Sequence, residues 1–390
     1  PAPQMADLKA KMKLQSDPGM PLVEIKDLSK TAGDTVSVDA FNVSTGKPLM
    51  GDRNAEGRSV PLSPLSMDIK IDNATWGVDC GGKMSQKRTK HDLRMIAMHH
   101  HLGYWPSLLW QRCLVHLAGL RGKQTGQSWK VPLATDPDFA DVMVNPVKAP
   151  TFNRHFVVDG TTLVKGGQQL ASVDATDVFK LSHLDELSWR TKAADKKNQP
   201  VAIQDEPAAY DSPIMDVRML GPGAYRSLLT DLTASNNIRA FQQAAWNRAS
   251  YGSKHPLFMG EVGMWNGILV REMDFSILMD PSDVVPHVAA ANKATATETN
   301  VTVAAIAGTL QVERGILLGA QALGCALGTT GSDEVGAMYE HWYNLQRNCE
   351  VFAEFMGGEA KLRYAFTNED GEPEMTDNGV MVIDSVITKA

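Results

Sequence analysis

The longest run of helical spacing in the sequence covers residues 84–118. Apolar side chains recur there every three or four residues, for example at Leu93, Ile96, Ala97 and Tyr104. This spacing places them on one face of an α-helix. About 35 helical residues would span roughly 50 Å, which is more than a compact core usually requires. The pattern therefore predicts a long helix on which other elements pack.

Both ends of this predicted helix carry suitable residues, but its middle contains a proline. Asp92 suits the positive end of the helix dipole, and Gly119 is a typical stop. Pro106 has no amide hydrogen, and its ring clashes with the carbonyl four residues earlier. We therefore expect a kink or a break near Trp105.

Two segments with alternating polarity precede the long helix. Residues 35–43 and 66–76 alternate apolar with polar side chains, as half-buried strands do. The twenty-one residues between them, 44–64, contain six glycines or prolines. Compact domains rarely carry loops this long unless the loops bind something. We predict a hairpin that projects from the body; the alternative is a disordered surface loop.

After residue 150 the pattern indicates a mixed α+β region. Helices are predicted at 174–191, 221–232, 235–248, 313–327 and 336–357. Strands are predicted at 214–220, within 255–272 as a strand–turn–strand unit, at 362–367 and at 379–387, with a strand or loop at 151–158. Residues 192–213 are linker-like, and residues 289–307 are extended in character. In the helix at 174–191 the expected core contacts are Phe179, Leu181, Leu184, Leu187 and Trp189.

Composition narrows the class of protein. The 390 residues are 43% hydrophobic and 21% charged, as in an ordinary soluble globular protein. The formal net charge of -7 argues against a dedicated nucleic-acid reader, because such proteins usually carry a basic face. No apolar run approaches the ~18 to 20 residues of a membrane span, so no membrane partner is expected. No secretion signal opens the sequence.

The sequence contains no convincing catalytic or metal-binding motif. The cysteines are Cys80, Cys113, Cys325 and Cys349. They lack metal-ligand spacing and are expected to be buried, inert thiols. Three consecutive histidines at 99–101 fit a polar, pH-sensitive patch at a subunit contact better than a metal site. The segment GTTGSDEVG at 328–336 lacks the lysine of a phosphate loop and is expected to follow a helix as a turn. We expect no catalytic residue, metal or cofactor.

Several motifs resemble the major capsid proteins of N4-like tailed bacteriophages. They are MGDRNAEG at 50–57, GKMSQKRTKHDLRMIAMHHHLGYW at 82–105, FNRHFVV at 152–158, MWNGILV at 264–270, RGILLGAQAL at 314–323 and YNLQRNCEVFAEFMGGEAKLRY at 343–364. Each motif alone is weak, whereas their order and spacing together are fairly specific. The resemblance covers residues 21–390, which is nearly the whole chain.

This resemblance implies an α+β protein with the HK97-like (Johnson) capsid fold. By position along the chain, residues 1–32 look like an N-terminal arm and residues 33–76 like an extended loop hairpin. Residues 77–150 look like the peripheral domain with its long spine helix. Residues 151–310 then form the axial domain, and residues 311–390 complete the peripheral and axial domains.

The function implied by the resemblance is structural, without catalysis. A major capsid protein of this family self-assembles as hexamers and pentamers into the icosahedral head shell of a tailed double-stranded DNA bacteriophage. Expected partners are further copies of the chain, a scaffolding protein and a portal during assembly, and optionally a decoration or cement protein. The shell encloses DNA without sequence-specific binding. The protein would reside in the virion after assembly in the cytoplasm of the bacterial host.

Two alternatives remain open from the sequence. An encapsulin-like cellular compartment shell protein shares the fold but encloses cargo enzymes, and neighbouring terminase and portal genes would favour a phage instead. A soluble enzyme with an unrecognised site would be a monomer with a deep polar pocket.

Polar and charged side chains in the expected arm, loop and helix are candidates for contacts between subunits. The candidates are Lys9, Lys11, Lys13, Lys47, Asp52, Arg53, Glu56, Arg58, Arg88, Asn153 and Arg154. Asn153 and Arg154 are expected to point at partners. Arms and loops exchanged between subunits add avidity without strong single contacts.

Overall fold

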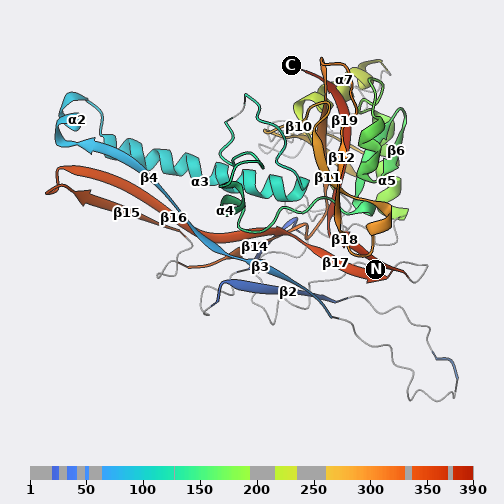
Figure 1. Ribbon diagram of the computed structural model, residues 1–390, viewed down its shortest axis with the longest axis horizontal. Coiled ribbons are helices and arrows are strands. Elements are labelled where there is room, and N and C mark those ends of the chain that lie inside the picture. The colour runs from blue at the N-terminus through green and yellow to red at the C-terminus, as the bar shows by residue number, and fades with distance from the viewer. Residues whose placement is uncertain are drawn as a thin grey trace, which may run out of the picture.

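The computed structural model describes residues 20–25, 33–41, 49–51, 64–126, 128–193, 216–234, 261–329, 336–367 and 372–389. In these residues the chain forms a broad body and a narrow extension, which we call the projection (Figure 1). The projection consists of residues 72–105 and 336–356, so segments far apart in the sequence lie side by side in it.

The projection and its root share one five-stranded sheet. Its strands run in the order β1 (Leu22–Ile25), β14 (Leu323–Leu327), β16 (Asn348–Lys361) and β15 (Gly336–Tyr343), with β4 (Asp72–Gly82) also paired to β16. Helices α2 (Lys83–Arg88) and α3 (Leu93–Ala118) follow β4. Figure 1 shows α3 running along this sheet from the end of the projection into the body.

Helix α3 covers only one face of the sheet. Cys80 on β4 and Cys349 and Val351 on β16 form a buried cluster with Ala97 of the helix. Because successive strand residues point to opposite faces, the residues between these positions point away from α3. Nearer the body, the ring of Trp76 on β4 stacks on Tyr104 of the helix, with 3.9 Å between ring centroids.

The body contains an eight-stranded sheet. Its order is β6 (Thr162–Lys165), β5 (His155–Asp159), β19 (Val380–Thr388), β13 (Leu310–Leu318), β7 (Asp216–Leu220), β9 (Ile268–Glu272) and β8 (Glu261–Trp265), with β10 (Ile277–Met279) paired to β13. Helices α5 (Leu181–Ala193) and α7 (Pro222–Ala234) pack on it, and their leucines join a core with Phe156, Leu317 and Ile383.

Smaller elements complete the described chain. Three two-stranded hairpins pair β2 (Thr35–Phe41) with β3 (Pro64–Lys70), β11 (Val284–Val288) with β12 (Glu298–Thr302), and β17 (Arg363–Thr367) with β18 (Pro373–Asp377). Short helices are α4 (Phe139–Met143), η3 (Phe152–Arg154), η4 (Gly167–Ser172) and η7 (Ala290–Asn292). None of the described helices is long and apolar enough to cross a membrane.

The predicted stop of the long helix at Gly119 is confirmed, but its predicted start at residue 84 is wrong, because the separate helix α2 precedes α3. The side chain of Asp92 caps α3 by accepting hydrogen bonds from the amides of Arg94 and Met95. Gly119 ends it in the left-handed conformation, with φ of 66°. The expected break near Pro106 is wrong. Helix α3 has 26 residues, and Pro106 lies inside it.

Other predictions are also confirmed. The strand of the predicted hairpin at 35–43 appears as β2, and 66–76 covers the end of β3 and the start of β4. The strand–helix pair β7–α7, the pair β8–β9 and the last strand β19 also stand where the pattern placed them. The predicted linker at 192–213, except its first two residues, and the predicted helix at 235–248 lie outside the described residues.

Two predicted helices are wrong. Residues 313–327 form most of β13 and all of β14, and residues 336–357 form β15 and most of β16. Strands β13 and β14 are mostly buried, and β13 buries even the charged Glu313 and Arg314, so neither strand keeps a regular alternation of apolar and polar residues. For the same reason the segment at 328–336 follows a strand and not a helix.

The turn between β15 and β16 has an unusual backbone conformation. Asn344, Leu345 and Gln346 all have positive φ, although none is glycine. Asn tolerates this conformation, whereas Leu and Gln adopt it rarely, so only the first of the three residues is typical of a turn.

The predicted helix at 174–191 begins only at Leu181. The carboxylates of Asp174 and Asp177 accept hydrogen bonds from nearby backbone amides, and such bonds compete with a helix. Four of its five expected core side chains are buried, but Trp189 is 62% exposed, so that contact was wrong.

A buried cluster around Asp384 joins α3 to the body sheet. Arg314 on β13 donates to both carboxylate oxygens of Asp384 on β19, at 2.7 and 2.8 Å. It also donates to the carbonyl of Ala118, the last residue of α3, at 3.1 Å. The imidazole of His155 on β5 lies 2.7 Å from the same carboxylate. Burial alone would raise the pKa of Asp384, but the cation of Arg314 and the bond to His155 hold that pKa well below its ordinary range.

Three further buried ion pairs lie in and beside the sheet of the projection. Asp377 on β18 accepts from Arg363 at 2.7 Å and lies 2.9 Å from the ammonium of Lys361. Burial would raise the pKa of Asp377, but these two cations lower it to about 2. Arg112 in α3 pairs with Glu359 on β16 at 2.8 Å. The helix and both sheets are thus connected by charges that water does not reach.

Replacing Asp384 by asparagine tests this cluster. The change removes the negative charge and leaves the guanidinium of Arg314 buried without its counterion. We expect the free energy of unfolding of Asp384→Asn to fall by about 3–5 kcal/mol in chemical denaturation. The matched control is Asp141→Asn, because Asp141 is exposed on α4 and its change should stay within about 0.5 kcal/mol. Equal stabilities of the two variants would contradict the structural role of the cluster.

Candidate functional site

Most of the candidate contact residues fall outside the described chain. These residues are Lys9, Lys11, Lys13, Lys47, Asp52, Arg53, Glu56 and Arg58. Arg88 ends helix α2 and is exposed at the end of the projection. Asn153 and Arg154 lie in η3, in the body, so the structure does not bring them near Arg88.

The side chains of Asn153 and Arg154 are engaged within the subunit. Asn153 donates to the hydroxyl of Thr376 at 2.7 Å and accepts from that of Thr151 at 2.9 Å. Arg154 is only 2% exposed. The expectation that Arg154 points at a partner is therefore corrected for the single chain, because its side chain is enclosed by its own neighbours.

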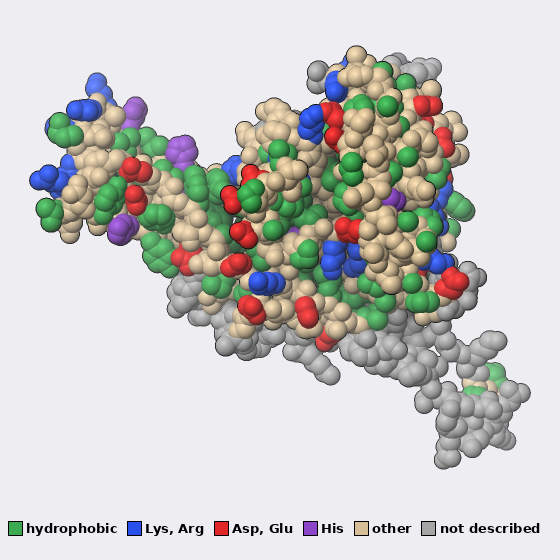
Figure 2. All heavy atoms as spheres, viewed as in Figure 1, with side chains coloured by type: hydrophobic (Ala, Val, Ile, Leu, Met, Phe, Trp, Pro, Cys, Tyr) green, Lys and Arg blue, Asp and Glu red, His purple; other side chains and the backbone are tan. Residues whose placement is uncertain are grey.

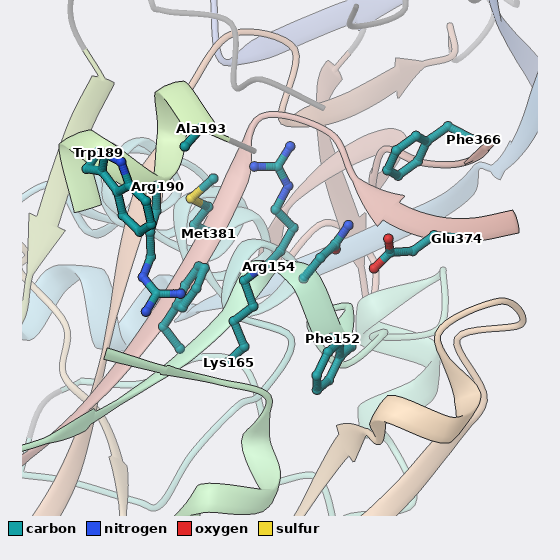
Figure 3. A pocket seen from close by; sticks show the side chains of 11 residues that line it. Phe152, Arg154, Lys165, Trp189, Arg190, Ala193, Phe366, Glu374 and Met381 are labelled. Carbon is teal, nitrogen blue, oxygen red and sulfur yellow. The ribbon is translucent and has the colours of Figure 1, made fainter. Parts of the chain in front are cut away.

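Arg154 lines a cavity with a volume of about 160 Å³. Figure 3 shows it between Trp189 and Arg190 on one side and Phe366 and Glu374 on the other. Arg190 is held by an ion pair with Glu186 from the same helix. Ordinary ligand pockets measure about 300–1,000 Å³, so this cavity is small for a substrate site.

The projection exposes a large share of apolar side chains. Of thirteen large hydrophobic side chains that are exposed in the described residues, eight belong to it. They are Met84, Met95, Ile96, Leu102, Met338, Tyr339, Trp342 and Leu345. Exposed apolar groups concentrated in one part of a molecule mark interaction surfaces. The projection is therefore the most prominent candidate contact surface in the described residues.

The histidine and cysteine predictions have mixed outcomes. His99 and His100 are exposed on the projection, whereas His101 is buried, 3.0 Å from the carbonyl of Val351. Three cysteines are buried and Cys325 is half-buried, and all four are free thiols. Burial raises the pKa of Cys80 to about 11, which keeps this thiol protonated. The described residues contain no group of three acidic, histidine or cysteine side chains arranged to hold a metal.

Reasoning from the sequence missed the sheet side of the projection. The signal was present in β16, where buried Cys349, Val351 and Ala353 alternate with the more accessible Glu350 and Phe352. This period of two is typical of a strand. This strand pattern was mistaken for a helix, because the same aromatic and acidic residues also fit an amphipathic helix.

Histidines buried in the subunit make it sensitive to acid. His116 lies near the body end of α3, with Nε2 3.3 Å from the carbonyl of Met143. The pKa of His116 is lowered to about 3, mainly by burial. The hydrogen bond to the carbonyl of Met143 raises the pKa, and the nearby cations Arg112 and Lys361 lower it. Burial likewise lowers the pKa of His183 to about 4.

Subunits of virus shells have this architecture, in which a long helix and a sheet form a projection from a broad body. The fold is the HK97-like capsid fold. The capsid of Ralstonia phage GP4 superposes with a TM-score of 0.74 at 20% identity, over 97% of this chain and 91% of that one. The cyanophage Pam1 capsid gives 0.61 at 19%, over 94% and 88%. The capsid of Helicobacter pylori bacteriophage KHP30 gives 0.56 at 11%, over 95% and 89%.

The sequence itself identifies the family. The model of the phage capsid protein family matches residues 2–389, and the chain belongs to this family. No curated protein matches it. The chain is thus a major capsid protein that forms a shell and resides in the virion. The family match favours a phage over a cellular compartment, and it indicates a structural role.

The buried histidine His116 generates a prediction about pH. Since its pKa in the folded subunit lies below the unfolded value of 6.5, the unfolded chain binds more protons below pH 6.5. Stability from this group is therefore complete above pH 6.5 and is lost as the pH falls towards 3. The free energy of unfolding should drop by about 1.4 kcal/mol per pH unit for such a histidine.

The variant His116→Gln keeps a hydrogen-bond donor for Met143 but does not titrate. Denaturation of unassembled subunits at several pH values between 6.5 and 4 should give a shallower slope for it than for the wild type. An exposed control, His99→Gln, should leave the slope unchanged. Identical slopes for all three proteins would overturn the assignment to His116.

Proposed function

We propose that the chain assembles as hexamers and pentamers into the icosahedral head shell of a tailed phage and encloses double-stranded DNA. The observation that carries the proposal is the family match over residues 2–389, together with an HK97-like fold. The exposed apolar projection supports it, because a free monomer would leave these side chains in water.

The proposed domains follow the order of the chain. We assign 1–32 to an arm, 33–76 to the extended loop, 77–150 to the peripheral domain and 151–310 to the axial domain. The last part, 311–390, completes both. In support, β13 and β19 lie in the body sheet while β14 and β16 lie in the sheet of the projection.

The net charge suits a container for DNA. A formal charge of -7 gives little attraction between the wall and phosphate groups. Such a wall confines the genome without gripping it, so packaging and release meet less resistance. Binding to DNA is accordingly proposed to be independent of sequence.

Assembly is proposed to occur in the cytoplasm of the bacterial host with helper proteins. Identical subunits that form both five- and six-membered rings need control of curvature, which a scaffolding protein can provide, and a portal supplies one unique vertex. A decoration or cement protein on the outside completes the proposed set of partners. The chain itself is proposed to act without catalysis or a cofactor.

The arm and loop are proposed to reach neighbouring subunits. The basic side chains Lys9, Lys11 and Lys13 would serve the arm. The loop would contribute Lys47, Asp52, Arg53, Glu56 and Arg58. Contacts spread over such segments add avidity, so no single residue among them has to be essential.

Deleting residues 47–63 tests the role of the loop. The remaining strands β2 and β3 bury Val36, Val38 and Ile69 in their own cluster, so the subunit should still fold. We expect soluble, folded protein with an unchanged thermal transition but no stable shells in electron microscopy. Replacing the same residues by a glycine–serine segment of equal length is the control for loop length.

The wild-type chain, expressed alone and with its neighbouring genes, provides the reference. Round shells, or rings of five and six, are expected from it. Normal shells from the deletion would reject the role of the loop, and a wild-type monomer under both conditions would reject the proposed function.

A further inference from the structure

The sheet of the projection has a second face, which α3 does not cover. On β16 this face carries Glu350 and Phe352, because Cys349 and Val351 point towards the helix. Register places Asp79 of β4 directly opposite Glu350. On the other side of β16, His341 of β15 is opposite Glu350.

Two carboxylates therefore stand side by side on this face. Like charges directly opposite on neighbouring strands destabilise a sheet. The nearest positive partner is His341, whose Nδ1 lies 3.9 Å from Glu350 and whose side chain is 64% exposed. Within the described residues, no lysine or arginine forms an ion pair with Asp79 or Glu350.

An aromatic strip lies beside these carboxylates. The ring of Phe352 crosses Gly77 so closely that a Cβ atom on the glycine would meet it at 2.3 Å. On the other side of Phe352, register places Tyr339, which is 47% exposed. We call Asp79, Glu350, Phe352 and Tyr339 the back face. It offers negative charge next to half-exposed aromatic rings.

The end of the projection has the opposite charge. Lys83, Lys87, Arg88 and Lys90 follow one another in and after α2, which has no buried residue. We call these four residues the basic tip. Figure 2 shows lysine and arginine side chains gathered at this end of the molecule. Within the described residues, none of the four takes part in an ion pair.

The basic tip forms no ion pair with the back face of its own chain in the described residues, although Lys83 follows β4 directly. Asp79 accepts a hydrogen bond from the amide of Gly81 at 2.7 Å, but its negative charge has no lysine or arginine beside it in the described residues. The two surfaces are therefore complementary in charge. Complementary patches on one molecule can join copies head to tail, and such contacts close into rings when the rotation between copies allows it.

We propose that the basic tip of one copy docks on the back face of a neighbouring copy. The proposal rests on the shell-forming function and adds which two surfaces meet. Lysine and arginine of the tip provide the counterions for Asp79 and Glu350, and Met84, which is 64% exposed beside them, covers the aromatic strip.

A second copy fits these surfaces better than nucleic acid does. Phosphate groups would be attracted to the basic tip but repelled by the carboxylates of the back face. Another copy of the chain supplies a partner for both surfaces at once. The partner is therefore this same protein, and binding of the tip to DNA is one outcome that the test distinguishes.

The test is an exchange of charges. The tip variant is Lys87→Glu with Arg88→Glu, which places glutamates opposite the carboxylates of the back face. The yield of shells in electron microscopy and sedimentation should drop at least about tenfold. In the face variant, Asp79→Lys with Glu350→Lys, the yield should drop likewise. Combining all four substitutions restores opposite charges across the contact and should restore most of the yield.

Matched controls separate the contact from general effects. Lys165→Glu with Arg226→Glu makes the same change of charge on exposed residues of the body, and should assemble as the wild type does. Thermal unfolding of each unassembled variant checks folding. If the face variant unfolds early, the milder pair Asp79→Asn with Glu350→Gln takes its place, and its yield should fall less steeply with added salt than that of the wild type.

Normal yield from the tip variant would overturn the proposal while leaving the shell function intact. So would failure of the fourfold variant when its subunits are folded. Normal shells that hold less DNA would assign the tip to nucleic acid, which also overturns it. Failure of the proposed shell function itself would give a different result, because the wild-type protein would then form no shells.

Discussion

The buried guanidinium of Arg314 is the constraint on which the subunit depends. It holds Asp384 of the body sheet with two hydrogen bonds and the last carbonyl of α3 with a third. The last residue of α3, the helix of the projection, is thus hydrogen-bonded to a guanidinium inside the body. A carbonyl at a helix end is an attractive site for a cation, because the helix dipole is negative there. The direction of the projection is therefore fixed by directional bonds, where apolar contacts alone would permit sliding.

Buried ion pairs do not make this subunit especially stable, since removing charges from water costs several kcal/mol for each ion. Apolar residues in place of Arg112 and Glu359 could pack equally well. What the pairs add is one defined arrangement, because any shift of α3 against β16 would separate two buried charges. For a shell subunit this matters more than stability, because an angular error at the base of a long projection grows into a larger displacement at its end.

Elements with local signals could be predicted from the sequence. Asp92 and Gly119 mark the ends of α3 by short-range chemistry, and β2 and β19 have regular patterns. The strand β19 is just as buried, but it is rich in the β-branched residues that favour strands. The strands β13 and β14 could not be recognised locally, because burial removes their alternation and they contain few β-branched residues. Nor could the candidate surface: Asp79 and Glu350 are neighbours only through the pairing of β4 with β16, 271 positions apart in the sequence. Pro106 shows the reverse case, where packing along α3 outweighs a local breaker.

The placement of charge in the subunit fits the demands of assembly. Inside the chain, charges are paired and shielded from water, so they are nearly insensitive to salt. On the projection, cations and carboxylates stay exposed, where each ion pair is worth about 1 kcal/mol or less. Contacts of that strength can break and form again while a shell is being built, which lets a wrongly placed copy leave. Many weak contacts repeated over a closed shell still give a stable particle. Strong, specific bonds within the subunit and weak, repeated ones at its surface are thus two parts of one design.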